Sequence, residues 1–530
     1  MSSSSLFNRR HQCRRMRIAS QRLRTGQSFL AGQLFLLLSM ALLCPGNKAF
    51  SQNTGDDPAF RCLDPDANVI VHINLPIILS KVSLDDIAAP ISHIAHMDVK
   101  NLLQNIAQTG LDLKRSLYVS TTIRANYTDR YVSFILPLSD SGKFISFVQQ
   151  KVPDLQIIPL PGKARSAGDK TIGVAWNDQL ATITISLGTP TDSSYATQTA
   201  KRSMRLLEGY NNSFYTSDPT FRQLFSDGGD IHIMSAEDNP LSLFTKMFGK
   251  TGALSNIQSL IVLRKRSFTS LSFGTGRISG RNITVVPPDT IALYKALNTR
   301  PLNTDLVARI PGKMLGFANF HFDPAALISL LDQFHYRTML DTSLAPLGLS
   351  VNDFAKAIKG DFMVAATMPA NLAAPTSSNP PSKMPDFFYV VTINDPIALF
   401  NINNKLKLLK DSGAYTLKDN ILVVSNTKQL ADSYFSAERR NTGFVTDKMK
   451  KSPVGVVLNM GLISDFLRTT APTESESHLH FLDTLKKIDR VSLSSGLLEN
   501  NNEIETALDI ELVDKSTNSL RAFLQLLNHP

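Results

Sequence analysis

The feature that most constrains the fold is an alternation of apolar and polar residues in short segments. Residues 69–75 place Val69, Val71 and Ile73 at every second position, with His72 between them. A period of two predicts a β-strand whose two faces differ in polarity. Such strands favour antiparallel sheets with one face solvated or only partly covered. The sequence therefore predicts an α+β fold class, in which helices pack on one face of mainly antiparallel sheets.

This pattern returns in the second half of the chain, and later segments follow it in the same order. Residues 316–322 repeat the first strand, with Asn319 at the position of His72 and His321 at that of Asn74. Further matches, each given as a first-half segment with its counterpart, are 117–120 with 362–365, 131–138 with 388–393, 172–185 with 415–424, 231–234 with 456–458, 269–273 with 491–495, and 283–286 with 504–508. The common order predicts an internal duplication rather than a solenoid of short repeats.

The domain organisation follows from the duplication. We expect a signal peptide over 1–51, a linker over 52–61, a first α+β module over 62–299 and a second over 305–530. Each module has about the upper size of a single domain.

The turn chemistry identifies one hairpin with particular clarity. Residues 172–176 and 180–185 are apolar and flank Asn177 and Asp178, which are favoured in tight turns. Trp176, the only tryptophan, ends the first strand. We expect its indole to pack on the sheet face beside this turn, as a structural residue.

The N-terminus has the pattern of an export signal. Residues 1–28 contain seven arginines and no acidic residue, and an apolar run follows over 29–43. That run has the length of a signal-peptide core and is short for a membrane span. Small residues before the junction predict cleavage between Ser51 and Gln52. The alternative is an uncleaved single-pass anchor; no second apolar run of spanning length follows.

Lipidation of Cys44 is a further alternative, because this cysteine directly follows the apolar run. A lipid-attachment motif needs Gly, Ala or Ser before the cysteine, and Leu43 occupies that position. The motif therefore favours cleavage after Ser51.

The charge and the cysteine content limit the functions and the cross-links that are possible for the mature chain. The net charge of +10 comes largely from the export segment, since without residues 1–51 there are 47 basic and 45 acidic residues. This balance predicts no nucleic-acid binding and no electrostatic attraction to anionic membranes. Only Cys62 remains after cleavage, which excludes an intramolecular disulfide.

Several of these segments together resemble a known family. They are the strand over 68–75, the Gly-Leu-Asp-Leu of 110–113, the helix cap Ser139-Asp140 and the Ala-Trp-Asn-Asp of 175–178. In this order they resemble a family of exported, often lipoprotein-like proteins of Gram-negative bacteria that is catalogued only as a domain of unknown function. The resemblance spans nearly the whole mature chain. It implies an envelope location and no known activity or functional residue.

Metal-binding patterns are incomplete. His93 and His96 are spaced to share a helix face, and His478 and His480 to share a strand face. Neither pair has a third ligand at a suitable spacing. We therefore predict no metal site and no cofactor.

Phosphate-binding loops are incomplete as well. Residues 248–251 end like a P-loop, but Phe244 stands where the first glycine is needed. Residues 274–280 have one residue too many for a dinucleotide fingerprint and lie between two strand-like segments. A hairpin loop is the better interpretation of the second motif.

Nucleophile motifs do not form a recognisable active site either. Residues 425–428 have the form Ser-x-x-Lys and residues 250–252 the form Lys-Thr-Gly, but penicillin-recognising enzymes carry them in the opposite order. We expect Cys62 to be buried and the carboxylate pairs at 56–57 and 85–86 to serve as caps or solvated charges. No catalytic residue is predicted.

These observations favour an exported envelope protein without catalytic activity, located in the periplasm, on the outer membrane or outside the cell. Its partner would be an envelope protein, a glycan or a lipid. One alternative is a structural or assembly component, which an exposed apolar patch would favour. The other is a hydrolase whose two carboxylates come from distant segments, which a polar cleft containing two acids would favour.

Overall fold

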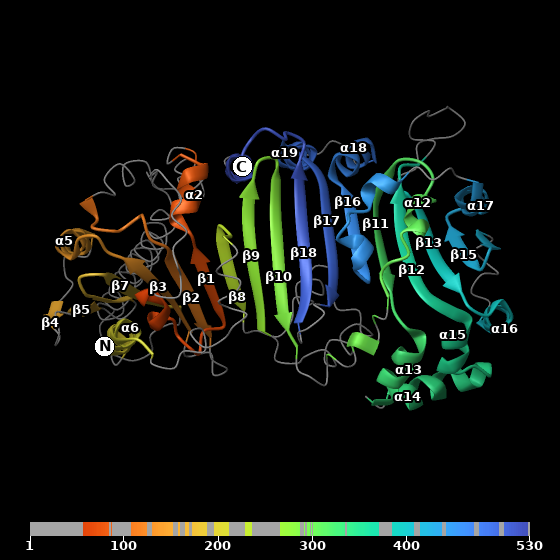
Figure 1. The fold of residues 1–530 in the computed structure, drawn as a ribbon, viewed down its shortest axis with the longest axis horizontal. Coiled ribbons are helices and arrows are strands. Elements are labelled where there is room, and N and C mark those ends of the chain that lie inside the picture. The colour runs from red at the N-terminus through yellow and green to blue at the C-terminus, as the bar shows by residue number, and fades with distance from the viewer. Residues whose placement is uncertain are drawn as a thin grey trace, which may run out of the picture. The chain divides into compact units, whose positions relative to one another are not determined.

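Figure 1 shows the fold in a computed structural model. The structure describes residues 57–83, 86, 108–123, 130–151, 157–159, 165–168, 172–187, 195–210, 228–235, 266–286, 291, 294–296, 298, 300–333, 336–369, 384–406, 414–436, 441–470, 476–497 and 503–527. The predicted cleavage junction at Ser51 and Gln52 lies outside the described residues. So do Cys44, the pair His93 and His96, and the P-loop-like segment.

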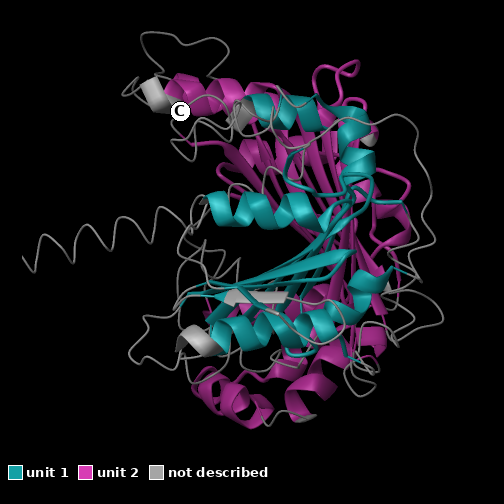
Figure 2. Cartoon of the chain, turned by 90° about the vertical axis from the view of Figure 1, so that its left-hand side faces the viewer, with its two compact units in different colours: residues 1–236, 520–530 teal, residues 237–519 magenta. Residues whose placement is uncertain are grey.

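The chain has an α+β fold made of two compact units, coloured separately in Figure 2. Unit 1 comprises residues 1–236 and 520–530, and unit 2 comprises residues 237–519. The boundary differs from that of the modules expected over 62–299 and 305–530. The reason is that the hairpin β9–β10 (Arg266–Gly274 and Arg277–Val285) continues, through β10, the sheet formed by strands from the second half.

Unit 1 contains eight described strands with short helices. Its elements are η2 (Pro58–Cys62), β1 (Val69–Ile73), α2 (Leu75–Lys81), β2 (Leu117–Ile123), β3 (Arg130–Pro137), α5 (Ser141–Lys151), β4 (Ile157–Pro159), β5 (Arg165–Gly168), β6 (Ile172–Trp176), β7 (Leu180–Ser186), α6 (Tyr195–Glu208) and β8 (Ile231–Ser235). The last helix of the chain, α20 (Ser519–Leu527), lies almost wholly in unit 1.

Unit 2 contains ten described strands. After β9 and β10 come α12 (Asp305–Ala308), β11 (Met314–His321), α13 (Pro324–Gln333), α14 (Tyr336–Leu344), η5 (Ala345–Leu347), α15 (Val351–Ala357), β12 (Ile358–Thr367), β13 (Asp386–Ile393), α16 (Pro396–Leu406), β14 (Tyr415–Lys418), β15 (Ile421–Ser425), α17 (Lys428–Ser436), η7 (Thr442–Phe444), η8 (Met449–Lys451), β16 (Val454–Asn459), α18 (Met460–Thr470), α19 (Glu476–Lys486), β17 (Ile488–Leu497) and β18 (Glu503–Leu512).

All described strand pairs are antiparallel. In unit 1 the strands pair in the order β4-β5-β6-β7-β3-β2-β1-β8. In unit 2 the order is β9-β10-β18-β17-β16-β11-β12-β13-β15-β14. The series β6-β7-β3-β2-β1-β8 of unit 1 has the same connectivity as β14-β15-β13-β12-β11-β16 of unit 2. Such a correspondence is what an internal duplication predicts, and we retain the duplication as a proposal.

The hairpin predicted over residues 172–185 forms at its turn residues, and a second hairpin forms between β14 and β15. The β6–β7 turn is held by the Asn177 side chain, whose Oδ1 accepts the amides of Gln179 and Leu180 at 2.9 and 2.8 Å. The β14–β15 turn places Asp419 and Asn420 at φ 52° and 57°. Left-handed conformations at both turn positions match the twist of the flanking strands.

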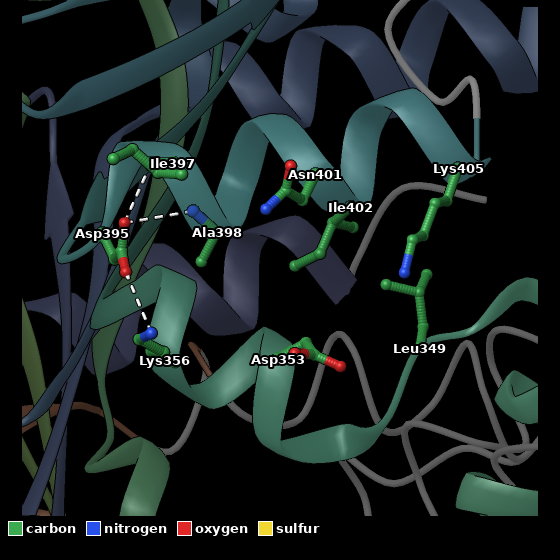
Figure 3. Close-up of a pocket in the computed structure, with 9 residues that line it drawn as sticks. All are labelled: Leu349, Asp353, Lys356, Asp395, Ile397, Ala398, Asn401, Ile402 and Lys405. Atoms are coloured by element: carbon green, nitrogen blue, oxygen red, sulfur yellow. Dashed lines mark hydrogen bonds and ion pairs between the residues drawn. The ribbon is translucent and has the colours of Figure 1, made fainter.

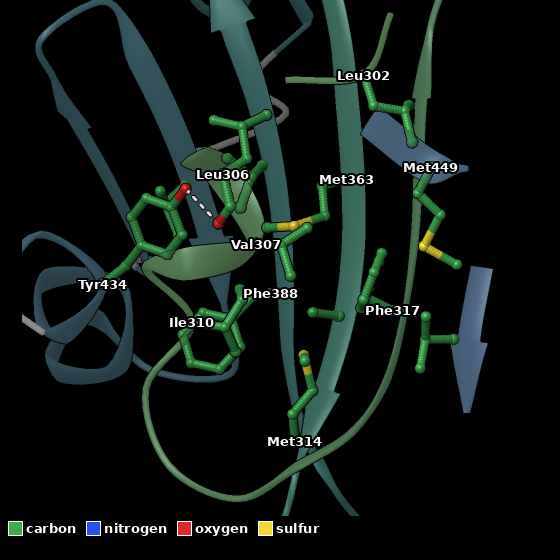
Figure 4. Close-up of a cluster of buried hydrophobic side chains, with 14 of the residues drawn as sticks. Leu302, Leu306, Val307, Ile310, Met314, Phe317, Met363, Phe388, Tyr434 and Met449 are labelled. Atoms are coloured by element: carbon green, nitrogen blue, oxygen red, sulfur yellow. Dashed lines mark hydrogen bonds between the residues drawn. The ribbon is translucent and has the colours of Figure 1, made fainter. Parts of the chain in front are cut away.

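The core of unit 2 lies on one face of its sheet, under α12 and α17 (Figure 4). Phe317, Met363 and Phe388 come from three neighbouring strands and are buried there. Leu306 of α12 and Tyr434 of α17 cover them, and the Tyr434 hydroxyl donates to the Leu306 carbonyl oxygen at 3.0 Å. The helices thus cover the strand positions that share a face with Phe317.

Other helices of unit 2 lie at the strand ends (Figure 1). Helices α18 and α19 are at one end of β16 and β17, whereas α13, α14 and α15 are at the other end of β11 and β12.

Candidate functional site

The sheet face opposite the core of unit 2 is apolar. Cross-strand partners in an antiparallel sheet point to the same side, so the pairing register identifies its members. We name as the apolar face these sixteen residues of six strands: Val454, Val456 and Leu458 of β16; Gly316, Ala318 and Phe320 of β11; Phe362, Val364 and Ala366 of β12; Phe387, Tyr389 and Val391 of β13; Leu422 and Val424 of β15; and Tyr415 and Leu417 of β14.

Much of the apolar face is accessible to solvent. Tyr389 is 49% exposed, Leu417 41%, Leu458 39% and Phe320 36%. Of the other members only Gly316 and Leu422 are buried, and the rest are half-buried. Six strands spaced by about 4.8 Å give this face a width of roughly 24 Å. A contiguous exposed patch of this kind marks a binding or interaction surface more often than a bare structural surface.

Aromatic rings are stacked along one edge of the apolar face. Phe320 and Phe362 are direct cross-strand partners, with ring centroids 5.4 Å apart and an interplanar angle of 5°. Phe322, just beyond β11, continues the stack at 5.1 Å from Phe362. These rings present a flat apolar surface without hydrogen-bonding groups.

A row of small polar side chains adjoins the apolar face on the same side of the sheet. It continues in register from Val454 and consists of Ser495 of β17, Thr506 of β18, Asn282 of β10 and Thr269 of β9. We name these four residues the polar row. Thr506 Oγ1 donates to Ser495 Oγ at 3.0 Å, and Asn282 Nδ2 donates to Thr269 Oγ1 at 2.8 Å. All four are half-buried and none carries a charge.

The polar residues of the first strands do not face solvent, as their alternation led us to expect. His72, Asn319 and His321 are buried, and that expectation is wrong for all three. The helix-covered side accommodates them because each finds a hydrogen-bond partner there. Asn319 Nδ2, for example, donates to the Asn303 carbonyl oxygen at 3.1 Å. Their apolar neighbour Ala318 faces the more accessible side instead.

His321 belongs to a buried polar cluster that holds strands together. Its Nδ1 lies 3.0 Å from Asp361 Oδ1. The second oxygen of Asp361 accepts from Thr392 Oγ1 at 3.0 Å and from Arg300 Nη2 at 3.2 Å. Burial, followed by the nearby Arg300 guanidinium, lowers the pKa of His321, against an opposing effect from Asp361. The carboxylate is already bonded to three side chains. This His–Asp pair therefore links β11, β12 and β13 and is not arranged to activate a nucleophile.

A pocket of about 380 Å³ opens between α15 and α16 (Figure 3). Leu349 and Ile402 are buried and form part of its apolar lining. Ile397, at the start of α16, also lines it and is among the most exposed large apolar side chains of the described residues. Asn401 adds an amide from the same helix.

Both carboxylates of this pocket cap helices. Asp395 Oδ1 accepts the backbone amides of Ile397 and Ala398 at 2.9 and 3.1 Å, and Asp353 Oδ2 accepts the amide and the hydroxyl of Ser350 at 2.8 Å each. Their pKa values are lowered, that of Asp395 first by the amide of Ala398 and that of Asp353 first by the Ser350 hydroxyl. A glycosidase needs one acid with a raised pKa. The pocket therefore lacks the acid–base pair that the hydrolase alternative requires.

The Ser-x-x-Lys segment and Cys62 make structural contacts. In the Ser-x-x-Lys segment, Ser425 donates to the Phe387 carbonyl oxygen at 2.7 Å, whereas Lys428 contacts Thr416 and Asp432. Cys62 is buried, and burial, aided by Asp57, raises the pKa of its thiol to about 12. These are structural roles.

The remaining motifs give no site in the described part of the chain. Gly274 and Arg277 are partners at the end of the β9–β10 hairpin, so residues 274–280 form the predicted hairpin loop and second strand. No group of three or more His, Cys, Asp or Glu residues that could hold a metal occurs among the described residues. His480 lies in α19 rather than on a strand, and nothing is described of the His478 side chain.

Sequence reasoning missed the apolar face as a candidate site. The signal was present, because Ala318 and Phe320 alternate with Asn319 and His321 in the strand that we identified. Alternation distinguishes two faces of a strand but does not say which one the helices cover.

No family model matches the chain, and no curated protein matches it. Solved structures of TP0453 are similar to part of it. Crystal form IV has 12% identity and a TM-score of 0.27, covering 46% of this chain and 85% of TP0453. Crystal form III has 11% identity and a TM-score of 0.28, covering 47% and 88%. These scores are too low for an inference about function.

Within the described ranges, no helix has both the length and the apolar character needed to cross a bilayer.

Proposed function

We propose that this chain is an exported, non-catalytic binding protein that holds an apolar ligand on the apolar face of unit 2. The arginine-rich start and the apolar run over 29–43 support export. The observation that carries the binding function is the composition of the face. None of its sixteen residues is charged, and fourteen of them are exposed or half-buried.

The energetic argument concerns the area removed from water. Leaving apolar side chains in contact with water costs about 25 cal/mol per Å² relative to covering them. On the opposite face of the same strands, α12 and α17 cover the apolar side chains, so that Phe317, Phe388 and Tyr434 are buried. A ligand that covers Phe320, Tyr389 and their neighbours recovers the same type of free energy.

An assembly role through the same face is the second candidate. The exposed apolar patch is the feature that favours this alternative as well, since two copies of an apolar sheet face can cover one another. The hydrolase alternative has less support, because helix-capping hydrogen bonds lower the pKa values of both Asp353 and Asp395 in the pocket between α15 and α16, whereas a general acid needs a raised pKa.

The test uses the environment-sensitive probe 1-anilinonaphthalene-8-sulfonate (ANS) with the mature chain. We expect saturable fluorescence enhancement, and at least a tenfold weaker affinity in Tyr389→Asp, because a carboxylate in the patch resists desolvation. Val513→Asp is the matched control: Val513 is 58% exposed and lies just beyond β18, away from the apolar face. Equal affinity for all three proteins would overturn the proposal.

Oligomeric state separates the two candidates. Light scattering after gel filtration should give a monomer for the wild type if the face holds a ligand. A dimer that Tyr389→Asp dissociates would instead favour the assembly role.

A further inference from the structure

We infer that the ligand is an uncharged amphiphilic lipid, with its acyl chain on the apolar face and a hydroxyl-bearing head group, such as glycerol, on the polar row. This inference rests on the proposed function and specifies the ligand. The apolar face and the polar row adjoin on the same side of the sheet. Phe320 of the apolar face pairs with Val454, and Val454 pairs with Ser495 of the polar row.

The apolar face offers little to a protein partner. Protein interfaces of ordinary size contain roughly one hydrogen bond per 100–200 Å². In the apolar face the only side-chain polar atoms are the hydroxyls of Tyr389 and Tyr415. The backbone groups of its strands are engaged in ladders on both sides, except for β14, which among the described strands pairs with β15 alone. An acyl chain has no hydrogen bonds to make and therefore fits such a surface.

The polar row has the complementary chemistry for a head group. The hydroxyls of Ser495, Thr506 and Thr269 and the amide of Asn282 are both donors and acceptors. Part of this capacity is used within the sheet, by the bonds of Thr506 to Ser495, Asn282 to Thr269 and Thr284 Oγ1 to Asn282 Oδ1 at 3.1 Å. The side chain of Tyr294 also hydrogen-bonds to that of Ser495. The remaining lone pairs and hydroxyl protons are open to a ligand. Glycerol hydroxyls are likewise donors and acceptors, so they can join the row without leaving any group unpaired.

The positions of the charged side chains disfavour a ligand with an anionic head group. Arg277, Arg281 and Arg490 of these strands lie on the opposite side of the sheet, where they are paired with carboxylates. Arg281, the residue before Asn282, bonds to Glu505 at 3.1 Å, and Arg277 bonds to Asp509. A phosphate or carboxylate on the polar row would thus lose hydration without gaining a positive partner.

The experiment measures displacement of ANS by monoacylglycerols of 8, 10 and 12 carbons and by the fatty acids of the same lengths, all below their aggregation concentrations. A fully buried methylene contributes about 0.8 kcal/mol. A chain lying on an open face stays half exposed, so we expect the dissociation constant to fall about fourfold for every two carbons. The monoacylglycerol should bind more tightly than the acid of equal length.

Two variants test which surface binds the head group and which binds the acyl chain. Thr506→Val is nearly isosteric and removes one hydroxyl of the polar row. It should weaken monoacylglycerol binding about fivefold, the value of one net hydrogen bond, and leave fatty-acid binding and the chain-length dependence unchanged. Tyr389→Asp should weaken both series, and Val513→Asp neither. Far-UV circular dichroism and thermal unfolding check that each variant folds, and Phe320→Asp replaces Tyr389→Asp if the latter does not.

The outcomes distinguish this inference from the proposed function. ANS binding that depends on Tyr389 but resists displacement by every lipid overturns the lipid class and leaves the binding function in place. Displacement by the fatty acids that matches or exceeds that by monoacylglycerols overturns the uncharged head group. Absence of ANS binding to the wild type overturns both.

Discussion

The Nδ1 atoms of His72 and His232 lie 2.9 Å apart in the interior of unit 1. The two residues are cross-strand partners in β1 and β8, and their rings are stacked with centroids 5.1 Å apart. At this separation one Nδ1 carries a proton and the other accepts it, so the pair is compatible with two neutral rings and not with two charged ones. Burial and the neighbouring His232 hold the pKa of His72 well below its usual value of 6.5.

This pair predicts that stability falls in mild acid. Below pH 6.5 the unfolded chain protonates His72 whereas the folded chain does not, so protons favour unfolding. Between pH 7.5 and 5.5 the contribution of His72 to the free energy of unfolding should fall by about 1 kcal/mol. Urea unfolding of the wild type and His72→Asn at both pH values tests this. An equal pH dependence in the two proteins would contradict it.

Asp361 should be important for the stability of unit 2. Asp361→Ala leaves buried His321 and Thr392 without their shared acceptor, and loss of one partner from a buried ionic cluster typically costs about 3–5 kcal/mol. The measurement is the urea midpoint of unfolding. Asp447→Ala is the control, because Asp447 is exposed and pairs only with exposed Lys450. Its midpoint should match that of the wild type, and a similar shift in both variants would speak against a special role for Asp361.

Gly360 should not tolerate a side chain. Its φ is 102°, and an added Cβ would lie 1.9 Å from the Phe322 carbonyl oxygen. Gly360→Ala should therefore cost at least about 1–3 kcal/mol through backbone strain alone. Gly443→Ala provides the contrast, since nothing lies within 4 Å of its Cβ position. If both variants unfold at the wild-type temperature, the close approach of Gly360 to β11 is not as described.

Trp176 should report on the core of unit 1. Its side chain is buried and lies edge-on to Phe144, with centroids 6.1 Å apart. As the only tryptophan, it should emit at a short wavelength in the folded protein and shift to the red on unfolding. Trp176→Ala should cost about 3–5 kcal/mol. An unchanged unfolding midpoint with lost ANS binding would instead make Trp176 a ligand contact.

Export should leave a mature chain that begins at Gln52. Intact mass and N-terminal sequencing of material secreted by a bacterial host measure this directly. The control is a Ser51→Arg variant, in which a large charged residue at the cleavage junction should prevent processing. A chain that starts at a diacylated Cys44 would support the lipoprotein alternative.

The sequence by itself determined the local elements of this protein. Alternation over 69–75 and 316–322 located β1 and β11, and the turn residues Asn177 and Asp178 located the β6–β7 hairpin. These features depend on neighbouring residues only, because side-chain period and left-handed turn positions are properties of a few consecutive dihedral angles.

Tertiary structure decided which side of each strand became the interior. In β11 the side with Asn319 and His321 is covered by helices, and the more apolar side with Ala318 and Phe320 is the more accessible one. Buried polar groups are tolerated where partners from distant segments satisfy them, as Asp361 and Asn303 do here. Those partners lie 16 to 40 residues away in the chain, so no local pattern could reveal that the apolar alternation marked a binding surface rather than a core.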